Sequence, residues 1–165
     1  MNDKSINEII NDLVQPGEVD RFLDPKEARK KAMDLLARRE HSLDELCRKL
    51  EKAGFDAEVA FNAITQLKQE GLQSDERFVE SFVQSRINQG KGPERIRAEL
   101  GKKGVRDAIV DAALQDSGVD WFLMAREIRA AKFGAELPGD FKEKARQMRF
   151  LQYRGFESDH IQSAF

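Results

Sequence analysis

The chain has 165 residues, 40% of them hydrophobic and 35% charged, and a formal net charge of −2 at pH 7. A single cysteine, Cys47, rules out an internal disulfide, which is typical of proteins from a reducing compartment. No stretch approaches the roughly 20 apolar residues of a membrane-spanning helix, and the N-terminus lacks the apolar core of a signal peptide. We therefore expect a cytoplasmic protein with no membrane segment.

Residues 1–24 are expected to form an acidic N-terminal extension. They contain six acidic and two basic residues, a net charge of −4. Apolar residues at helical spacing from Ile6 to Val14 predict a short amphipathic helix that ends before Pro16-Gly17. The extension has no counterpart in the rest of the chain, and it either lacks order or docks on a basic face.

One sequence pattern occurs three times after this extension: a leucine followed four residues later by glycine and an apolar residue. The three glycines are 50 and then 51 residues apart, and alanine plus a large apolar residue follows each glycine nine and ten residues later. Such repetition is typical of an array of modules rather than one globule around one pocket. The three occurrences are Leu50 with Gly54-Phe55, Leu100 with Gly104-Val105, and Leu151 with Gly155-Phe156.

The first unit is expected to span residues 25–73 and to contain three helices. Asp24 is a candidate N-cap for the first helix, and a capping box of Ser42 and Glu45 predicts the start of the second. Gly54 is a typical left-handed terminator for that second helix. Apolar residues at helical spacing give each helix one buried face.

The second and third units are expected to span residues 74–115 and 116–165. Ser74 predicts the start of the second unit, and the turn Gly90–Pro93 leads into its second helix. The third unit diverges most, because a longer connection from Lys132 to Gly139 replaces that tight turn.

No alternating strand pattern is present, so the sequence predicts an all-α fold of nine or ten helices in three tandem three-helix repeats. A single unit of about 45 residues can bury only a marginal core. We expect neighbouring units to stack and supply the rest.

Residue types that carry chemistry are scarce. His41 and His160 have no histidine or cysteine partner at metal-ligand spacing, and both are expected at partly exposed helix ends. No activating base marks Cys47 as a nucleophile. The turn Gly90–Pro93 lacks the spacing of a phosphate-binding loop. We therefore expect no catalytic residue, no metal and no cofactor.

Basic residues recur on the second helix of each predicted unit. For any one of them, the simplest interpretation is a solvated polar face. Recurrence at the same place favours a basic stripe along one side of the array, suited to phosphate groups or to the acidic groove of a protein polymer. The candidate binding residues are Arg29, Lys30, Arg38, Arg39, Arg48, Lys49, Arg86, Lys91, Arg95, Lys102, Lys103, Lys144, Arg146, Arg149 and Arg154.

Three longer motifs also stand in order along the chain. The first is LLARREHSLDELCRKL, from Leu35 to Leu50. The second joins DERF, from Asp75, to GKGPxRI, from Gly90, and the third is RFLxxRGF, from Arg149. In order and register over residues 28–165, these motifs resemble the signature of the RecX family, the regulators of the recombinase RecA.

The resemblance implies an elongated, curved array of three-helix repeats that binds in the deep helical groove of the RecA–single-stranded DNA filament. There such proteins block extension of the filament or promote its disassembly. They thereby dampen recombination, ATP hydrolysis and LexA cleavage by RecA. The expected partner is the RecA nucleoprotein filament, and we expect the chain to act as a monomer.

Two other functions stay open at this point. Trihelical units with basic second helices resemble helix-turn-helix modules, so the chain could bind single- or double-stranded DNA directly. A generic helical scaffold for another protein is the third possibility. An enzyme is the least favoured, because nothing in the sequence supplies a nucleophile, base or metal.

Overall fold

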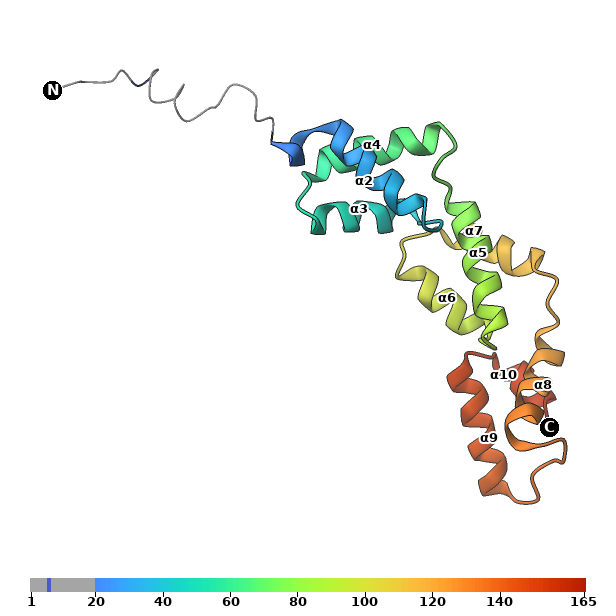
Figure 1. Cartoon of the computed structure of the whole chain (residues 1–165). Helices are drawn as coiled ribbons and strands as arrows, with labels where there is room; N and C mark the ends of the chain where they lie inside the picture. The colour runs from blue at the N-terminus through green and yellow to red at the C-terminus, as the bar shows by residue number, and fades with distance from the viewer. Residues whose placement is uncertain (1–5, 7–19) are drawn as a thin grey trace.

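The structure is a computed structural model that describes Ile6 and residues 20–165 (Figure 1). The amphipathic helix expected before Pro16 lies outside the described residues. Within them, all regular secondary structure is helical, and the predicted all-α fold is confirmed. The elements are η1 (Arg21–Leu23), α2 (Pro25–Leu36), α3 (Leu43–Lys52), α4 (Ala57–Gln69), α5 (Asp75–Asn88), α6 (Pro93–Gly101), α7 (Asp107–Asp116), α8 (Trp121–Phe133), α9 (Phe141–Arg154) and α10 (Ser158–Ser163).

The helices follow one another in three groups of three along a bent, elongated molecule (Figure 1). Each group encloses its own hydrophobic cluster, and Trp121 packs against both the second and the third cluster. The second helices of the groups, α3, α6 and α9, lie along the same side of the bend. Three small cores in a row therefore leave much of the surface of every helix in contact with solvent.

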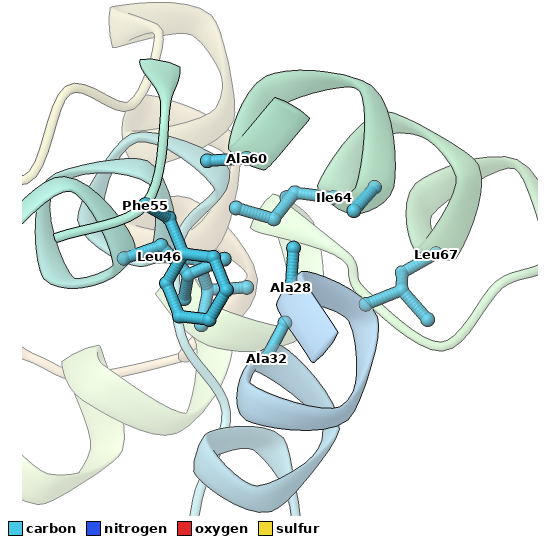
Figure 2. Close-up of a cluster of buried hydrophobic side chains, with 9 residues drawn as sticks. Ala28, Ala32, Leu46, Phe55, Ala60, Ile64 and Leu67 are labelled. Carbon is cyan, nitrogen blue, oxygen red and sulfur yellow. The ribbon is translucent and has the colours of Figure 1, made fainter. Parts of the chain in front are cut away.

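The first cluster shows how a group closes around few residues (Figure 2). Leu46 from α3 and Ile64 from α4 are fully buried, each worth about 1.5–3 kcal/mol of transfer free energy. Ala28 and Ala32 present only methyl groups from α2, so this helix packs closely on the other two. The small side chains of α2 thus compensate for the shortness of the unit.

The predicted helix starts are confirmed, but the capping box is not. Asp24 accepts a hydrogen bond from the backbone N–H of Lys26, and Ser42 Oγ accepts one from the N–H of Glu45 at 3.0 Å. The reciprocal half of the box was predicted wrongly, since the Glu45 carboxylate binds Arg39 and Lys103 instead. A tertiary ion pair has replaced the local contact that the sequence suggested.

Consecutive groups meet where the start of one second helix approaches the end of the next. The backbone N–H of Gly92 donates to the carbonyl of Arg154 at 2.8 Å, and that of Glu94 donates to the carbonyl of Gly155 at 2.9 Å. The start of α6 thereby satisfies N–H groups that an isolated helix leaves free, and its dipole continues that of α9. We call this contact the α6–α9 joint.

The α3–α6 joint repeats the arrangement with side chains as donors. Ser42 Oγ donates to the carbonyl of Lys103 at 2.7 Å, and Arg48 Nη1 donates to the carbonyl of Lys102 at 3.1 Å. The helices α9, α6 and α3 therefore follow one another end to end, and we call them together the second-helix ridge.

The glycines of the repeated pattern all have positive φ, as the prediction of left-handed terminators requires: +108° at Gly54, +70° at Gly104 and +95° at Gly155. At the first of these positions, no earlier three-helix group lies among the described residues to make such a contact. Instead η1 covers the end of α3: the Phe22 ring stands edge-on to Phe55, and the carbonyl of Phe22 accepts from the N–H of Asp56 at 3.1 Å.

Candidate functional site

A cationic cleft of about 430 Å³ opens beside the α3–α6 joint, between α3, α5 and α6. Six of its nine lining residues are basic and two are acidic, so it carries a formal charge of +4. Such a concentration of charge attracts anions, and phosphate groups above all. The lining residues are Glu45, Arg48, Lys49, Lys52, Phe82, Arg86, Glu99, Lys102 and Lys103.

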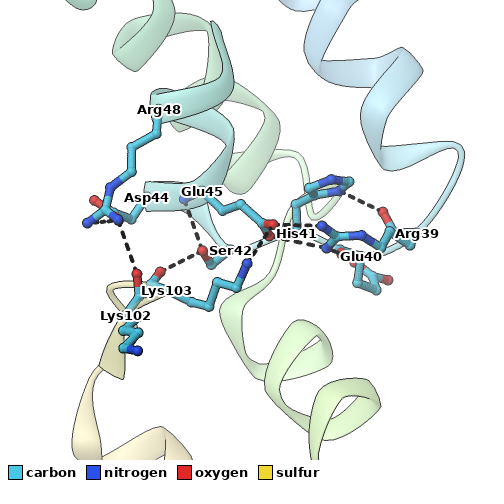
Figure 3. A network of polar contacts seen from close by, with 9 residues as sticks. All are labelled: Arg39, Glu40, His41, Ser42, Asp44, Glu45, Arg48, Lys102 and Lys103. Carbon is cyan, nitrogen blue, oxygen red and sulfur yellow. Dashed lines mark hydrogen bonds and ion pairs between the residues drawn. The ribbon is translucent and has the colours of Figure 1, made fainter. Parts of the chain in front are cut away.

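Glu45 organises one wall of the cationic cleft (Figure 3). Its Oε1 lies 2.6 Å from Arg39 Nη2 and 3.2 Å from Lys103 Nζ, and its side chain is only 7% exposed. Burial alone would raise the pKa of Glu45, but the hydrogen bonds and charges of Arg39 and Lys103 lower it to about 2. Arg39 and Lys103 were both predicted as binding residues, but here both hold Glu45, and Lys103 thereby links the second group to the first.

This ion pair predicts an acid-sensitive joint. Because the pKa of Glu45 is lower in the folded chain than its ordinary value of 4.5, its stabilisation is complete above about pH 4.5 and is lost as the pH falls toward 2. We expect Glu45→Gln to lower the free energy of unfolding at neutral pH and to match the unsubstituted chain near pH 2. Urea unfolding across this range measures both; parallel pH profiles for the two proteins would contradict the assignment.

A second carboxylate, Glu99, gathers three bases beside the cleft. It lies 2.8 Å from Arg86 Nε, 3.2 Å from Lys91 Nζ and 3.6 Å from Arg95 Nε. Burial would raise the pKa of Glu99, yet the hydrogen bonds and charges of Arg86 and Lys91 outweigh it and lower the pKa. One negative charge facing three positive charges leaves this cluster at +2, and the Arg86 guanidinium stacks 4.0 Å from the Phe82 ring centre.

The basic residues of α9 extend the charge past the α6–α9 joint. Arg154 Nη1 donates to the carbonyl of Gln89 at 3.0 Å, so it also fastens the joint. Arg146 pairs with Glu143 at 2.7 Å, and Arg149 is exposed. Lys144, also on α9, lies 5.7 Å from the ring centre of Phe165.

The structure does not bring all the predicted binding residues to one place. Arg29 and Lys30 lie on α2, and Arg29 pairs with Glu70 at 2.7 Å. Arg38, after the same helix, is exposed. Sequence reasoning missed Phe82, whose ring lines the cationic cleft. A signal was present, because Phe82 precedes Arg86 by one helical turn, the spacing of a cation–aromatic pair.

A larger groove of about 1260 Å³ lies on another face of α5, against α7, and has the opposite charge. Glu40, Glu76, Glu80 and Asp116 line it, and Arg77 is the single base among its lining residues. The groove would repel phosphate groups. An anionic partner is therefore expected to use the side of the array that carries the cationic cleft.

Of the groups considered for chemistry, the two histidines are buried and the Cys47 side chain is half-buried. His41 and His160 were both expected at partly exposed helix ends, and this was wrong: both are buried, and burial lowers the pKa of His41. Burial, with smaller contributions from Glu51 and Asp44, raises the pKa of the Cys47 thiol to about 11. Across Ile6 and residues 20–165, no three His, Cys, Asp or Glu side chains are grouped to hold a metal ion. No helix in this part of the chain is long and apolar enough to cross a membrane.

Comparison with known proteins identifies all three helical groups. Residues 28–67, 74–114 and 122–165 match the first, second and third three-helix domains of RecX. The chain is 50% identical over 137 residues to the regulatory protein RecX of Ectopseudomonas mendocina, covering 83% of this chain and 91% of that protein. The regulatory protein RecX of Halorhodospira halophila is 45% identical over 133 residues, which are 81% of this chain and 83% of the relative.

Solved structures share the fold. The crystal structure of RecX from Lactobacillus salivarius superposes with a TM-score of 0.71 at 21% identity, covering 85% of this chain and 93% of that one. A second crystal structure of a regulatory protein RecX gives a TM-score of 0.68 at 20% identity, with 84% and 71% covered. The domain matches, in order along the chain, and relatives with up to half of the aligned residues identical show that this chain belongs to the RecX family of regulatory proteins.

Proposed function

We propose that the chain is an inhibitor of RecA that binds in the helical groove of the RecA–single-stranded DNA filament. There it blocks filament extension or promotes disassembly, and so dampens recombination, ATP hydrolysis and LexA cleavage by RecA in the cytoplasm. Membership of the RecX family supports the partner. The observation that carries the proposal is the cationic cleft, which lies on the side of a long, bent array that could follow such a groove.

The mechanism needs no reaction at the bound chain. We treat residues 25–73, 74–115 and 116–165 as three modules, each of which presents one segment of the second-helix ridge. Weak contacts at successive modules add through effective concentration, so a monomer can bind firmly with no single strong contact. Binding across several protomers in one geometry shifts the filament toward that geometry, by no more than the difference in affinity between states.

The ridge lets us test this proposal with exposed residues. Lys49 and Lys102 line the cationic cleft, and neither forms an ion pair with any residue from 20 to 165. They are preferable to Arg39 and Lys103, whose reversal would leave the buried Glu45 beside new negative charges. We expect Lys49→Glu with Lys102→Glu to raise the concentration for half-inhibition of RecA ATPase on single-stranded DNA by about tenfold or more.

The matched control reverses two exposed lysines elsewhere, Lys26→Glu with Lys68→Glu on α2 and α4. It changes the net charge equally, so it should inhibit RecA as the unsubstituted chain does. Equal inhibition by both double variants would show that the cleft is not the binding surface. A chain that neither inhibits RecA nor sediments with its filament would end the proposal itself.

Direct binding to free DNA is the second candidate, favoured by the same charge of +4 in the cationic cleft. Binding of this kind weakens steeply with salt, because it releases counterions from the phosphates. A salt titration with duplex DNA and no RecA separates the two functions: tight, steeply salt-dependent binding supports the second.

A further inference from the structure

We propose that Tyr153 is a stacking platform for an unpaired base of single-stranded nucleic acid. This residue is the only tyrosine in the chain, and it stands on α9 beside the α6–α9 joint. Its side chain is 74% exposed, although a tyrosine ring is large and mostly apolar. An exposed ring of this kind on a cationic surface matches the chemistry by which proteins hold single strands, in which charged groups follow the backbone and aromatic rings stack on bases.

The ring is held in place by the joint. The Arg95 guanidinium lies 5.3 Å from the Tyr153 ring centre, and Arg95 Nη1 lies 3.4 Å from the carbonyl of Tyr153. This cation–aromatic contact orients the Tyr153 ring and places the positive charge of Arg95 beside it. The remaining exposed part of the ring is free for a second flat partner.

A continuous chain of side-chain contacts connects Tyr153 to the cationic cleft. Arg95 pairs with Glu99, Glu99 pairs with Arg86, and both Glu99 and Arg86 line the cleft. From Lys102 to Arg95 the path follows α6 for about 10 Å, given a rise of about 1.5 Å per residue. A strand whose phosphates lie in the cleft can therefore continue along α6 and place a base at Tyr153.

Tyr153 differs in residue type from the residues at the equivalent positions of the other two second helices. Two residues after the repeated leucine stand Lys52 in α3, Lys102 directly after α6, and Tyr153 in α9. The first two line the cationic cleft and suit phosphates, whereas the third offers a flat ring. Phe141, at the far end of α9, is 85% exposed but takes part in no cation–aromatic contact within residues 20–165, and it serves as a control.

Stacking predicts a preference for unpaired strands, because the faces of bases in a duplex are already covered by their neighbours. The inference deepens the proposed function, since the filament presents a single strand, but its test uses the full chain without any recombinase. The probe is an oligodeoxythymidylate of about 15 nucleotides, within the usual site size for such surfaces. The second probe is the duplex that this oligonucleotide forms with its complementary strand.

We expect Tyr153→Ala to weaken binding to the single strand by about tenfold, within the range that one stacked base contributes, and to leave duplex binding unchanged. Tyr153→Phe should bind like the unsubstituted chain, as should Phe141→Ala. The salt dependence should keep its slope in Tyr153→Ala, which removes no charge, and become shallower in Lys49→Glu with Lys102→Glu. The melting temperature of Tyr153→Ala should not change, because the ring is largely exposed.

A spectroscopic signature completes the test. In a chain labelled with ¹³C-tyrosine, the single ring gives one set of signals, and stacking should shift them on addition of the oligonucleotide. Unchanged ring signals, an equal loss of single-strand and duplex binding in Tyr153→Ala, or no binding of the oligonucleotide by the unsubstituted chain would each overturn the inference. Inhibition of RecA ATPase that persists in those cases leaves the proposed function intact.

Discussion

Gly155→Val is expected to lower the melting temperature by about 10 °C. A β-branched residue at φ +95° costs about 1–2 kcal/mol of backbone strain. Its Cβ would also lie 2.7 Å from the backbone nitrogen of Arg95, which forces the α6–α9 joint apart at about 1–3 kcal/mol more. Each kilocalorie corresponds to about 2–4 °C in a chain of this size. Differential scanning calorimetry measures the result.

Gly118→Val is the matched control. Gly118 also has a positive φ, +67°, but nothing lies within 4 Å of the Cβ that a substitution would add. Gly118→Val therefore carries the same kind of backbone strain as Gly155→Val but disturbs no contact between helical groups. We expect Gly155→Val to lose more stability than Gly118→Val and also to inhibit RecA less, because the bend between the second and third groups changes. Equal losses in the two variants would mean that the joint contributes no packing energy.

Arg129→Met is the second large change, with an expected loss of about 3–4 kcal/mol. Arg129 is only 2% exposed, yet it pairs with no carboxylate in the part of the chain that the structure describes. Its guanidinium donates instead to oxygens from three segments: Ala164 at 3.0 Å, Gln147 at 3.2 Å, and the connection before α9. Methionine fills similar volume but leaves these buried acceptors without a donor.

The control is Arg126→Met, on the same helix and exposed, for which we expect a change within about 0.5 kcal/mol. Hydrogen exchange should show faster opening of α8, α9 and α10 in Arg129→Met, with α2 to α4 unchanged, because each group has its own core. A loss no greater than that of Arg126→Met would contradict the role assigned to this buried cation.

Local rules were enough to predict the fold. The glycines at positions 54, 104 and 155 predicted the end of each second helix, and N-cap residues such as Ser42 predicted the helix starts. Both signals depend on backbone conformation within a few residues, so tertiary contacts do not override them. The RecX matches confirm the predicted three-helix repeats and the prediction of a regulatory protein rather than an enzyme.

The candidate site was only partly predictable, because its geometry depends on distant partners. The recurrence of basic residues on second helices indicated which side of the array carries positive charge. It could not show that Lys103 reaches Glu45, 58 residues earlier, or that Glu99 gathers three bases. For the same reason both histidines were misplaced: their burial comes from packing across helices, which a helix-end position does not reveal.

The η1 turn makes the two ends of the array unequal as places where a further three-helix module could be added. Phe22 occupies the place against Gly54 that a preceding module would need, whereas the start of α9 has no further helix end against it among the described residues. Duplication of a module could therefore lengthen the array between existing repeats or after the C-terminal repeat. A module added ahead of Asp20 would first have to displace the Phe22 ring from Gly54.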